Sequence, residues 1–515
     1  MQYTDITLVH HFLEKSAEKY PDKIAVIHDE RKITYYSIDN AANNLANFLS
    51  KNNFKKGDRI CIILKNSIEY IICYFAILKI GGIVVPLNTE ATIESLIQIL
   101  NDCSAKGLIC HSMNLEKVQK VITSVPTIRL AICDNKHAGS NTPKHFSEHV
   151  LYKIITTDTE NIFNEKINNY DIASIIYTSG STGKPKGVTL THLNSVTNTK
   201  SIITYLELSE KDKVLIVLPF YYCYGKSLLH THFIVGGTVV IDNRFVYPNL
   251  VLETMQREQV TGFSGVPSTF SILLNHSTFA KQNFPHLQYI TQAGGAMAPH
   301  IIKKLKKILP DKKIFIMYGA TEASARLSYL DPEMLEKKLG SIGKAIPGVT
   351  LTIVTEDGKK AKVNEIGEIV AQGDNIMLGY WNDPTETNSI LKEDGYHTGD
   401  LARCDKDGFL FVTGRKRDII KVAGNRLSAK EIEEILIQLP GIDEVAVIGV
   451  DDPILGEAIK AFIVPKDNKK ISDETIKNFC LKKLPLYKLP KYYHFLPTLP
   501  KNESGKIMKE VLKQQ

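Results

Sequence analysis

The sequence lacks several features that would assign it to a specialised class of protein. Its eight cysteines never form a Cys-x-x-Cys pair, so neither a zinc site of that type nor a redox dithiol is indicated. Its most apolar stretch, residues 68–87, contains Glu69, Lys79 and a Gly-Gly pair, which argues against a membrane span. The N-terminus has neither the basic start nor the apolar run of a secretory signal. We therefore expect a soluble cytoplasmic protein with reduced thiols, without integral membrane contact.

An excess of one charge is also lacking. The 515 residues include 63 Lys and Arg and 56 Asp and Glu, which leaves a net charge of +7. This is too small an excess to indicate a nucleic-acid-binding protein. Residues 415–515 carry an excess of five positive charges, from 19 basic and 14 acidic side chains. A basic C-terminal segment suits an anionic partner.

The hydrophobic pattern predicts an α/β protein. Short apolar segments such as 58–64, 83–86 and 107–110 alternate with helical segments such as 69–80 and 91–101, which is typical of mostly parallel sheets. From about residue 340, short strands separated by Gly or Asp turns indicate a small antiparallel barrel. After residue 414 helices and strands alternate again. We predict layered sheets with helices plus the barrel (340–414) in an N-terminal domain, 1–414, and a smaller α+β domain, 415–515.

Residues 177–188, Tyr-Thr-Ser-Gly-Ser-Thr-Gly-Lys-Pro-Lys-Gly-Val, have the composition of a polyphosphate-binding loop. Glycines let backbone N–H groups converge on an anion, while hydroxyls add donors and lysines add charge. The segment is not a Walker A motif, because Pro185 follows Lys184 and Thr178 stands where that motif needs its first Gly. A P-loop kinase or nucleotide hydrolase is therefore disfavoured.

This loop resembles that of the adenylate-forming superfamily, which includes acyl- and aryl-coenzyme A synthetases, peptide-synthetase adenylation domains and beetle luciferases. The resemblance extends from about residue 8 to residue 513. Further motifs follow in the family's order: Tyr-Gly-Ala-Thr-Glu at 318–322, His-Thr-Gly-Asp at 397–400, a basic segment at 414–421, Val-Ala-Gly-Asn-Arg-Leu-Ser at 422–428 and Asn-Glu-Ser-Gly-Lys at 502–506. We predict that residues 397–400 form a turn before the barrel strand 401–404.

The resemblance implies an ATP site with Mg²⁺. It assigns the adenylation catalyst to Lys506, the Mg²⁺ ligand to Glu322 and a contact with the α-phosphate to Thr321. Tyr318 would stack on adenine, Asp400 and Arg415 would hold the ribose, and Arg426 would contact the adenylate phosphate. The remaining ATP/AMP-binding residues that it implies are Thr178, Ser179, Gly180, Ser181, Thr182, Gly183, Lys184, Lys186, Gly294, Gly295, Ala296 and Gly319.

The same resemblance makes the C-terminal domain a mobile lid. Arg417 matches the hinge position, where the family often has Asp or Lys, and Lys421 lies in the same segment. Gly424 would line the tunnel through which a thiol reaches the adenylate. That thiol belongs to coenzyme A or to the phosphopantetheine arm of an acyl carrier protein.

The resemblance also assigns the acyl pocket, to Tyr222, Gly295, Ala296 and Ala320. Many coenzyme A synthetases have a His at the position of Tyr222, so an aromatic ring would replace the usual gate. Amino-acid-activating relatives place an Asp in this region, whereas residues 215–232 contain no Asp or Glu. An apolar acid, a fatty acid foremost or an aryl acid, is therefore favoured over an α-amino acid.

We predict an AMP-forming acyl-coenzyme A synthetase. One alternative is an acyl-AMP ligase that loads a carrier protein, and another is an aryl- or amino-acid-activating adenylation enzyme. An inactive lipid- or nucleotide-binding relative is disfavoured, because Glu322, Asp400, Arg415 and Lys506 are all present. The sequence does not indicate an oligomeric state.

Overall fold

The computed structural model describes residues 3–111, 115–133, 146–157, 163, 165–179, 185–422, 425–466, 471–501 and 507–514; of residues 115–118, 146–150, 179 and 426 it describes the backbone alone. The chain divides into two compact units, the first formed by residues 1–339, 345–350 and 371–396, and the second by 340–344, 351–370 and 397–515. The predicted domain boundary between residues 414 and 415 stays a prediction.

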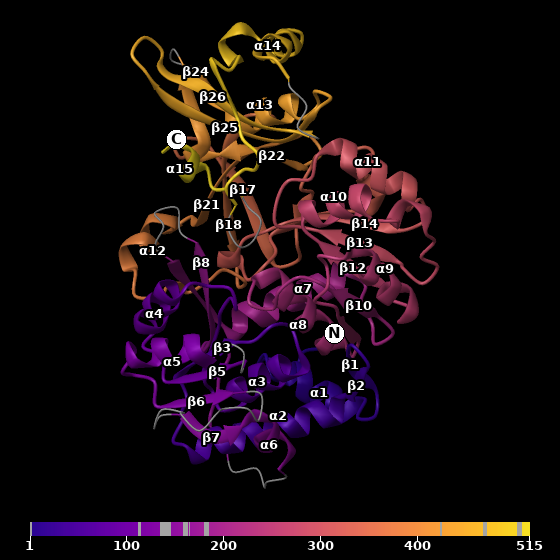
Figure 1. Cartoon of the computed structure of the whole chain (residues 1–515), viewed down its shortest axis with the longest axis vertical. Coiled ribbons are helices and arrows are strands. Elements are labelled where there is room, and N and C mark those ends of the chain that lie inside the picture. Colours follow the sequence, from indigo (N-terminus) through magenta and orange to yellow (C-terminus); the bar gives the residue numbers. More distant parts are fainter. Residues whose placement is uncertain are drawn as a thin grey trace. The chain divides into compact units, whose positions relative to one another are not determined.

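The first unit contains an eight-stranded sheet (Figure 1). Its strands β4, β3, β5, β6 and β7 run parallel, and β8 and β9 form an antiparallel hairpin. The order is β19 (Gly379–Tyr380), β9 (Pro185–Thr191), β8 (Ile172–Ser179), β4 (Ile83–Pro86), β3 (Arg59–Ile63), β5 (Gly107–Cys110), β6 (Leu130–Cys133) and β7 (Phe146–Val150).

A second, nine-stranded sheet belongs mainly to the same unit. Strands β11, β10, β12, β13 and β14 run parallel to one another, so their carboxyl ends share one edge. The order is β16 (Lys344–Ala345), β15 (Ser328–Leu330), β14 (Lys313–Tyr318), β13 (Tyr289–Gln292), β12 (Gly262–Gly265), β10 (Lys213–Ile216), β11 (Thr238–Ile241), β1 (Ile24–His28) and β2 (Arg31–Thr34).

Helices cover both sheets. Helix α3 packs on β3 and β4, and α8 packs on β10 and β11. The helices of this unit are α1 (His11–Lys19), α2 (Tyr35–Lys51), α3 (Ile68–Lys79), α4 (Ile93–Asp102), α5 (Leu115–Thr123), α6 (Leu151–Thr156), α7 (His192–Leu206), α8 (Cys223–Val235), α9 (Pro248–Arg257), α10 (Pro267–His276), α11 (Pro299–Ile308) and α12 (Pro384–Ile390), with 3₁₀ turns η2 (Phe279–Lys281), η3 (Thr321–Ala323) and η4 (Pro332–Met334).

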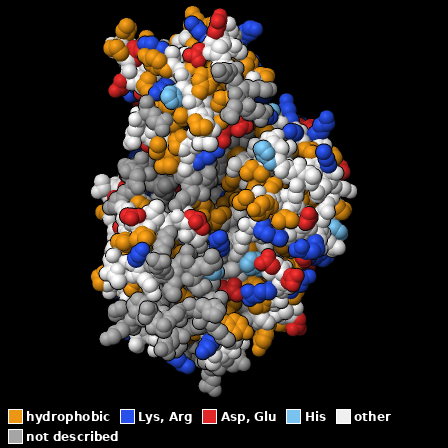
Figure 2. Space-filling model, viewed as in Figure 1, with side chains coloured by type: hydrophobic (Ala, Val, Ile, Leu, Met, Phe, Trp, Pro, Cys, Tyr) orange, Lys and Arg blue, Asp and Glu red, His pale blue; other side chains and the backbone are white. Residues whose placement is uncertain are grey.

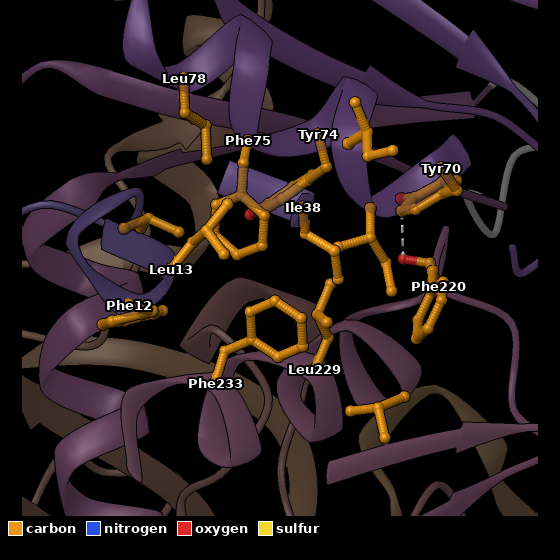
Figure 3. Packing of buried hydrophobic residues seen from close by; sticks show 14 of the residues in the cluster. Phe12, Leu13, Ile38, Tyr70, Tyr74, Phe75, Leu78, Phe220, Leu229 and Phe233 are labelled. Carbon is orange, nitrogen blue, oxygen red and sulfur yellow. Dashed lines mark hydrogen bonds between the residues drawn. The ribbon is translucent and has the colours of Figure 1, made fainter. Parts of the chain in front are cut away.

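The main core lies where α1, α2 and α3 meet α8 (Figure 3). Helix α3 is buried almost all round, and the Ser67 side chain caps its N-terminus by accepting from the Tyr70 N–H. Phe75 and Phe233 stack with ring centroids 5.4 Å apart, and the Tyr70 hydroxyl donates to the Phe220 carbonyl. The apolar stretch 68–87 is thus a buried helix followed by a buried strand.

The remaining sheets belong mainly to the second unit, although their residues 349–350, 371–373, 391–392 and 395–396 belong to the first. In the first of them β21 pairs antiparallel with both β20 and β22, and in the other β25 and β26 form a long antiparallel pair. The elements are β17 (Val349–Val354), β18 (Ile366–Gly373), β20 (Leu391–Lys392), β21 (Gly395–Cys404), β22 (Leu410–Arg415), η5 (Lys416–Asp418), β23 (Ile419–Val422), β24 (Asn425–Ser428), α13 (Ala429–Leu436), β25 (Ile442–Asp452), β26 (Gly456–Pro465), α14 (Asp473–Leu481), η7 (Leu486–Lys488), β27 (Tyr492–Phe495) and α15 (Lys509–Leu512).

One local expectation was wrong. The sequence predicted that His397–Asp400 forms a turn before a strand, but these residues lie inside β21. The Gly-containing stretch remains extended because Asp400 pairs with Arg415 on β22, and because the Thr398 hydroxyl donates to the Ile369 carbonyl. Long-range pairing therefore overrides the turn tendency of Gly399, whose φ of 71° bends the strand locally.

The remaining global features can be stated briefly. In the part of the chain that the structure describes, no helix combines the length and apolarity needed to cross a bilayer. Of the eight cysteines, six are buried, and Cys223 and Cys404 are partly exposed. On the face drawn in Figure 2, Lys and Arg side chains are interspersed with Asp and Glu.

Candidate active site

The carboxyl edge of the nine-stranded sheet collects several of the predicted site residues. Because β10, β12, β13 and β14 are parallel neighbours, the segments that follow them leave the sheet at the same edge. Residues 217–225 follow β10, residues 293–297 follow β13 and residues 319–323 follow β14. The predicted acyl pocket and adenine site therefore share this edge.

Direct contacts link these segments. The Thr321 hydroxyl donates to the Cys223 sulfur at 3.4 Å, and the Tyr224 hydroxyl lies 2.8 Å from that of Thr291. Tyr222 is the N-cap of α8 and is half-buried. The segment assigned to the acyl pocket and the Thr321 turn are thus in contact.

Two glycines of this edge have a steric explanation. A Cβ at Gly319 would lie 2.0 Å from the Ala325 carbonyl oxygen, so no larger residue fits between the two chain segments. Gly294 has a φ of 83°, a left-handed conformation that favours glycine. Gly294, Gly295 and Ala296 are all exposed, which leaves the surface after β13 open to a ligand. Ala320, the N-cap of η3, is half-buried.

The predicted phosphate loop connects β8 and β9, which form an antiparallel hairpin. Thr178 faces Lys186 across the hairpin, and residues 180–184 lie outside the described residues, as does the Ser179 side chain. Lys186 forms an ion pair with Glu386 of α12, and its ammonium lies 5.3 Å from the ring centroid of Tyr380. Both partners lie more than 190 residues from Lys186 in the sequence.

The environment of the Glu322 carboxylate suits its predicted role as a Mg²⁺ ligand. Its Oε1 accepts a hydrogen bond of 2.7 Å from the Tyr380 hydroxyl, and no Lys or Arg among the described residues forms an ion pair with it. A carboxylate that is half-buried and not neutralised by a cation is suited to a hard divalent metal. Burial and the charge of Glu322 raise the pKa of Tyr380, so its hydroxyl remains a donor at neutral pH.

In the second unit the two predicted ribose-binding residues lie next to each other on paired strands. Asp400 and Arg415 face each other on β21 and β22, and the Arg415 Nε lies 2.9 Å from Asp400 Oδ1. The Asp400 side chain is 9% exposed and that of Arg415 is 38% exposed. A fixed, nearly buried carboxylate of this kind can accept hydrogen bonds from a cis-diol.

A second carboxylate, that of Glu368, stabilises the strand that carries Asp400. Glu368 accepts from the Gly399 N–H at 3.0 Å, and it lies 3.2 Å from both His397 Nδ1 and the Lys416 ammonium. Burial alone would raise the pKa of Glu368, but these donors outweigh burial and lower it. Glu368 therefore stays ionised and holds the strand that carries Asp400.

The other predicted residues of this unit are only partly described. Arg417 lies in η5 with a half-exposed side chain, 3.8 Å from Asp418, and Lys421 is exposed on β23. Gly424, Lys506 and the side chain of Arg426 lie outside the described residues. Lys501 and Ile507 form a β-bridge at the base of the Lys506 segment.

Outside the predicted site, a cluster of polar side chains has the spacing of a metal site. Ligand atoms of His10, His11 and Glu14 lie within 4.8 Å of one another. However, the ammonium of Lys79 lies 2.7 Å from Glu14 and 2.9 Å from Asp39, and both distances are those of ion pairs. A cation already neutralises these carboxylates, so the geometry does not favour a metal ion there.

Tyr380 and Glu386 were missed by the sequence analysis. Neither belongs to a motif used there, and each reaches its partner only through the fold. The available signal was the segment Gly-Tyr-Trp-Asn-Asp-Pro, in which aromatic residues precede a helix start.

Comparison with known proteins identifies the family of this chain. The sequence model of the AMP-binding enzyme family matches residues 13–381, and that of the AMP-binding enzyme C-terminal domain matches residues 431–506. The chain belongs to the AMP-binding enzyme family. The long-chain-fatty-acid–CoA ligase of Escherichia coli O6:H1 is 31% identical over 527 residues, which cover 98% of this chain and 93% of that protein.

Two solved structures show the same fold. An anthranilate CoA ligase in complex with anthranoyl-AMP has a TM-score of 0.90 at 26% identity, covering 100% of this chain and 98% of that one. The o-succinylbenzoate CoA synthetase of Bacillus subtilis in complex with ATP and a magnesium ion has a TM-score of 0.86 at 28% identity, covering 98% and 99%. The predicted superfamily, fold class and AMP-forming ligase class are confirmed.

Proposed function

We propose that the protein joins an apolar carboxylic acid, a fatty acid foremost, to coenzyme A. The acid first reacts with ATP to give an acyl-adenylate and pyrophosphate, and the acyl group then passes to the thiol with release of AMP. The contact between Thr321 and Cys223 carries the proposal, because it joins the acid-binding segment to the turn assigned to the α-phosphate. The long-chain-fatty-acid–CoA ligase of Escherichia coli supports the choice of acid and acceptor.

In the first half-reaction a carboxylate oxygen attacks the α-phosphorus, and the bond from that phosphorus to the leaving pyrophosphate breaks. We assign the steadying of the pyrophosphate to the β8–β9 hairpin and the neutralisation of charge at the reacting atoms to Lys506. Such catalysis consists mainly of positioning and electrostatic stabilisation. Bound Mg²⁺ would neutralise phosphate charge, and Glu322 is the residue that we assign to hold it.

We assign binding of the nucleoside to three further predicted residues. Tyr318, at the end of β14, would cover the adenine ring, and Asp400 with its partner Arg415 would hold the ribose hydroxyls. Arg415 lies against Asp400 and keeps that carboxylate oriented, which supports its role as a fixed acceptor.

In the second half-reaction the thiol sulfur attacks the acyl carbon, and the bond from that carbon to the AMP oxygen breaks. We propose that residues beyond Arg417 rotate as a lid, so that Lys506 leaves and Gly424 lines the thiol path. Lid motions of this kind set the turnover of many enzymes. We also propose a cytoplasmic location, where ATP and coenzyme A are available.

The experiment is a screen of pyrophosphate release over acids from acetate to palmitate and common aryl acids, with and without coenzyme A. Each buried methylene contributes about 0.8 kcal/mol, or roughly fourfold in affinity, so activity should rise along the fatty-acid series and then fall. Tyr222→Ala should broaden the range of acids accepted. Exchange with α-amino acids alone would overturn the choice of acid, and activity with a carrier protein but not with coenzyme A would overturn the choice of acceptor.

A further inference from the structure

Tyr380 lies between the phosphate hairpin and the turn that carries Glu322. Through its backbone it belongs to the hairpin's sheet: β19 pairs antiparallel with β9, with Tyr380 opposite Val188. Its own N–H donates to the Thr387 hydroxyl of α12 at 2.9 Å, and the N–H of Trp381 donates to the Gly187 carbonyl at 2.7 Å. The position of Tyr380 is therefore fixed relative to the base of the phosphate loop.

The segment before Tyr380 is fastened to the Glu322 turn. The Met377 N–H donates to the Glu322 carbonyl at 2.8 Å, and the Asn375 side-chain amide donates to the Ala323 carbonyl at 3.2 Å. In the opposite direction, the Ser324 hydroxyl donates to the Asn375 carbonyl at 2.8 Å. Residues 375–380 thus hold the backbone of this turn on one side and strand β9 on the other.

The side chain of Tyr380 completes this link. Its hydroxyl donates to Glu322 Oε1 at 2.7 Å, across 58 residues of sequence. Its ring lies under the ammonium of Lys186, and Lys186 is itself held by Glu386. The Tyr380 hydroxyl therefore restricts the orientation of the Glu322 carboxylate.

We propose that Tyr380 is a positioning residue that orients the Glu322 carboxylate for the metal ion bound with ATP. The inference rests on the proposed function, in which Glu322 holds Mg²⁺. Since the hydroxyl occupies Oε1, the second oxygen, Oε2, would be the one available to hold the metal. Mg²⁺ requires nearly ideal octahedral geometry, so a carboxylate free to rotate would bind it less well.

The test uses Tyr380→Phe, which removes the hydroxyl and keeps the ring beneath Lys186. Binding of Mn²⁺, as a spectroscopic substitute for Mg²⁺, is measured by electron paramagnetic resonance in the presence of a non-hydrolysable ATP analogue. We expect Mn²⁺ binding to weaken by roughly tenfold, the scale of losing a hydrogen bond to a charged group. Binding of the analogue without metal should change by less than about twofold, because the variant leaves the other nucleotide contacts intact.

Tyr205→Phe is the matched control. It also removes a buried tyrosine hydroxyl of the same unit, one that donates to the Met317 sulfur at 3.0 Å, and it should leave Mn²⁺ binding unchanged. Unchanged Mn²⁺ binding in Tyr380→Phe, or equal losses in both variants, would overturn the inference.

A double-mutant cycle separates orientation from a general structural effect. If Tyr380 acts through Glu322, Tyr380→Phe should have no further effect on Mn²⁺ binding in a Glu322→Gln background. A loss of the same size in that background would show that the hydroxyl acts otherwise, and would refute the proposal. Failure of the wild-type protein to release pyrophosphate with any acid would instead refute the proposed function, so the two failures are distinguishable.

Discussion

Replacing Lys226 with Met should stabilise the protein. Lys226 lies on α8, is 2% exposed, and its ammonium donates to the Ser174 hydroxyl at 3.0 Å. No carboxylate among the described residues forms an ion pair with it. A buried charge without a counter-ion is costly, and a well-packed apolar side chain of similar length is often more stable.

The magnitude follows from the pKa of this lysine. Burial lowers the pKa of Lys226 from 10.5 to about 8. At 1.36 kcal/mol for each pKa unit, holding the protonated lysine in the folded state costs about 3 kcal/mol. Met would leave the buried Ser174 hydroxyl without its partner, at a cost of about 1 kcal/mol. We therefore expect Lys226→Met to raise the free energy of unfolding by about 2 kcal/mol at pH 7.

The sign of the pH dependence gives a second readout. Below pH 8 both folded and unfolded states carry the protonated lysine, so the full cost is present. Between pH 8 and 10.5 the folded state loses its proton first, so wild-type stability gains relative to the variant as the pH rises. The difference in the free energy of unfolding between Lys226→Met and the wild type should therefore decrease from pH 8 to pH 10.5.

The assay is guanidinium unfolding followed by fluorescence of Trp381, the single tryptophan, which lies in the first unit. Lys211→Met, at an exposed position, should change stability by less than about 0.5 kcal/mol. The double variant Lys226→Met/Ser174→Ala should be more stable than Lys226→Met alone by about 1 kcal/mol, because it also removes the unpaired hydroxyl. Destabilisation by Lys226→Met, or a difference that stays constant from pH 7 to 10.5, would show that Lys226 is not an uncompensated buried charge.

Three further predictions concern the reaction. Lys506→Ala should slow acyl-adenylate formation by roughly 10²–10³ but spare thioester formation from supplied acyl-adenylate, and equal losses in the two half-reactions would contradict its role. Asp400→Asn should raise the KM for ATP about tenfold, because the amide loses both the charge and its pairing with Arg415; an unchanged KM would place the ribose elsewhere. Arg417→Pro should preserve pyrophosphate release but reduce thioester formation, since Pro fixes φ at the hinge; normal turnover with coenzyme A would argue against lid rotation.

Local patterns in the sequence were sufficient to predict most of the elements. Segments such as 83–86 and 107–110 are apolar throughout, as buried parallel strands are, and they form β4 and β5. The stretch 397–400 was misjudged because its extended form depends on Arg415 and Ile369, which no local window contains.

The candidate site was predictable only where residues fall in compact motifs. Thr321 and Glu322 are adjacent in the sequence, and so are the residues of the phosphate loop. The role of Tyr380 could not be predicted, because its hydroxyl contacts Glu322 only when β19 is paired with β9. Lys226 was likewise overlooked, since a lysine in a helical pattern is normally exposed and only the packing of α8 buries it.

The thiol of Cys223 allows chemical labelling of the segment that we assign to acid binding. Six of the eight cysteines are buried, so a Cys404→Ser variant would leave Cys223 as the accessible thiol. Its sulfur lies beside the Thr321 hydroxyl, where the segment that we assign to the acid meets the turn that we assign to the α-phosphate. The rate at which a coloured disulfide reagent modifies Cys223 should therefore fall as an acid fills the pocket. Occupancy by any candidate acid becomes measurable in this way without nucleotide, turnover or a label on the substrate.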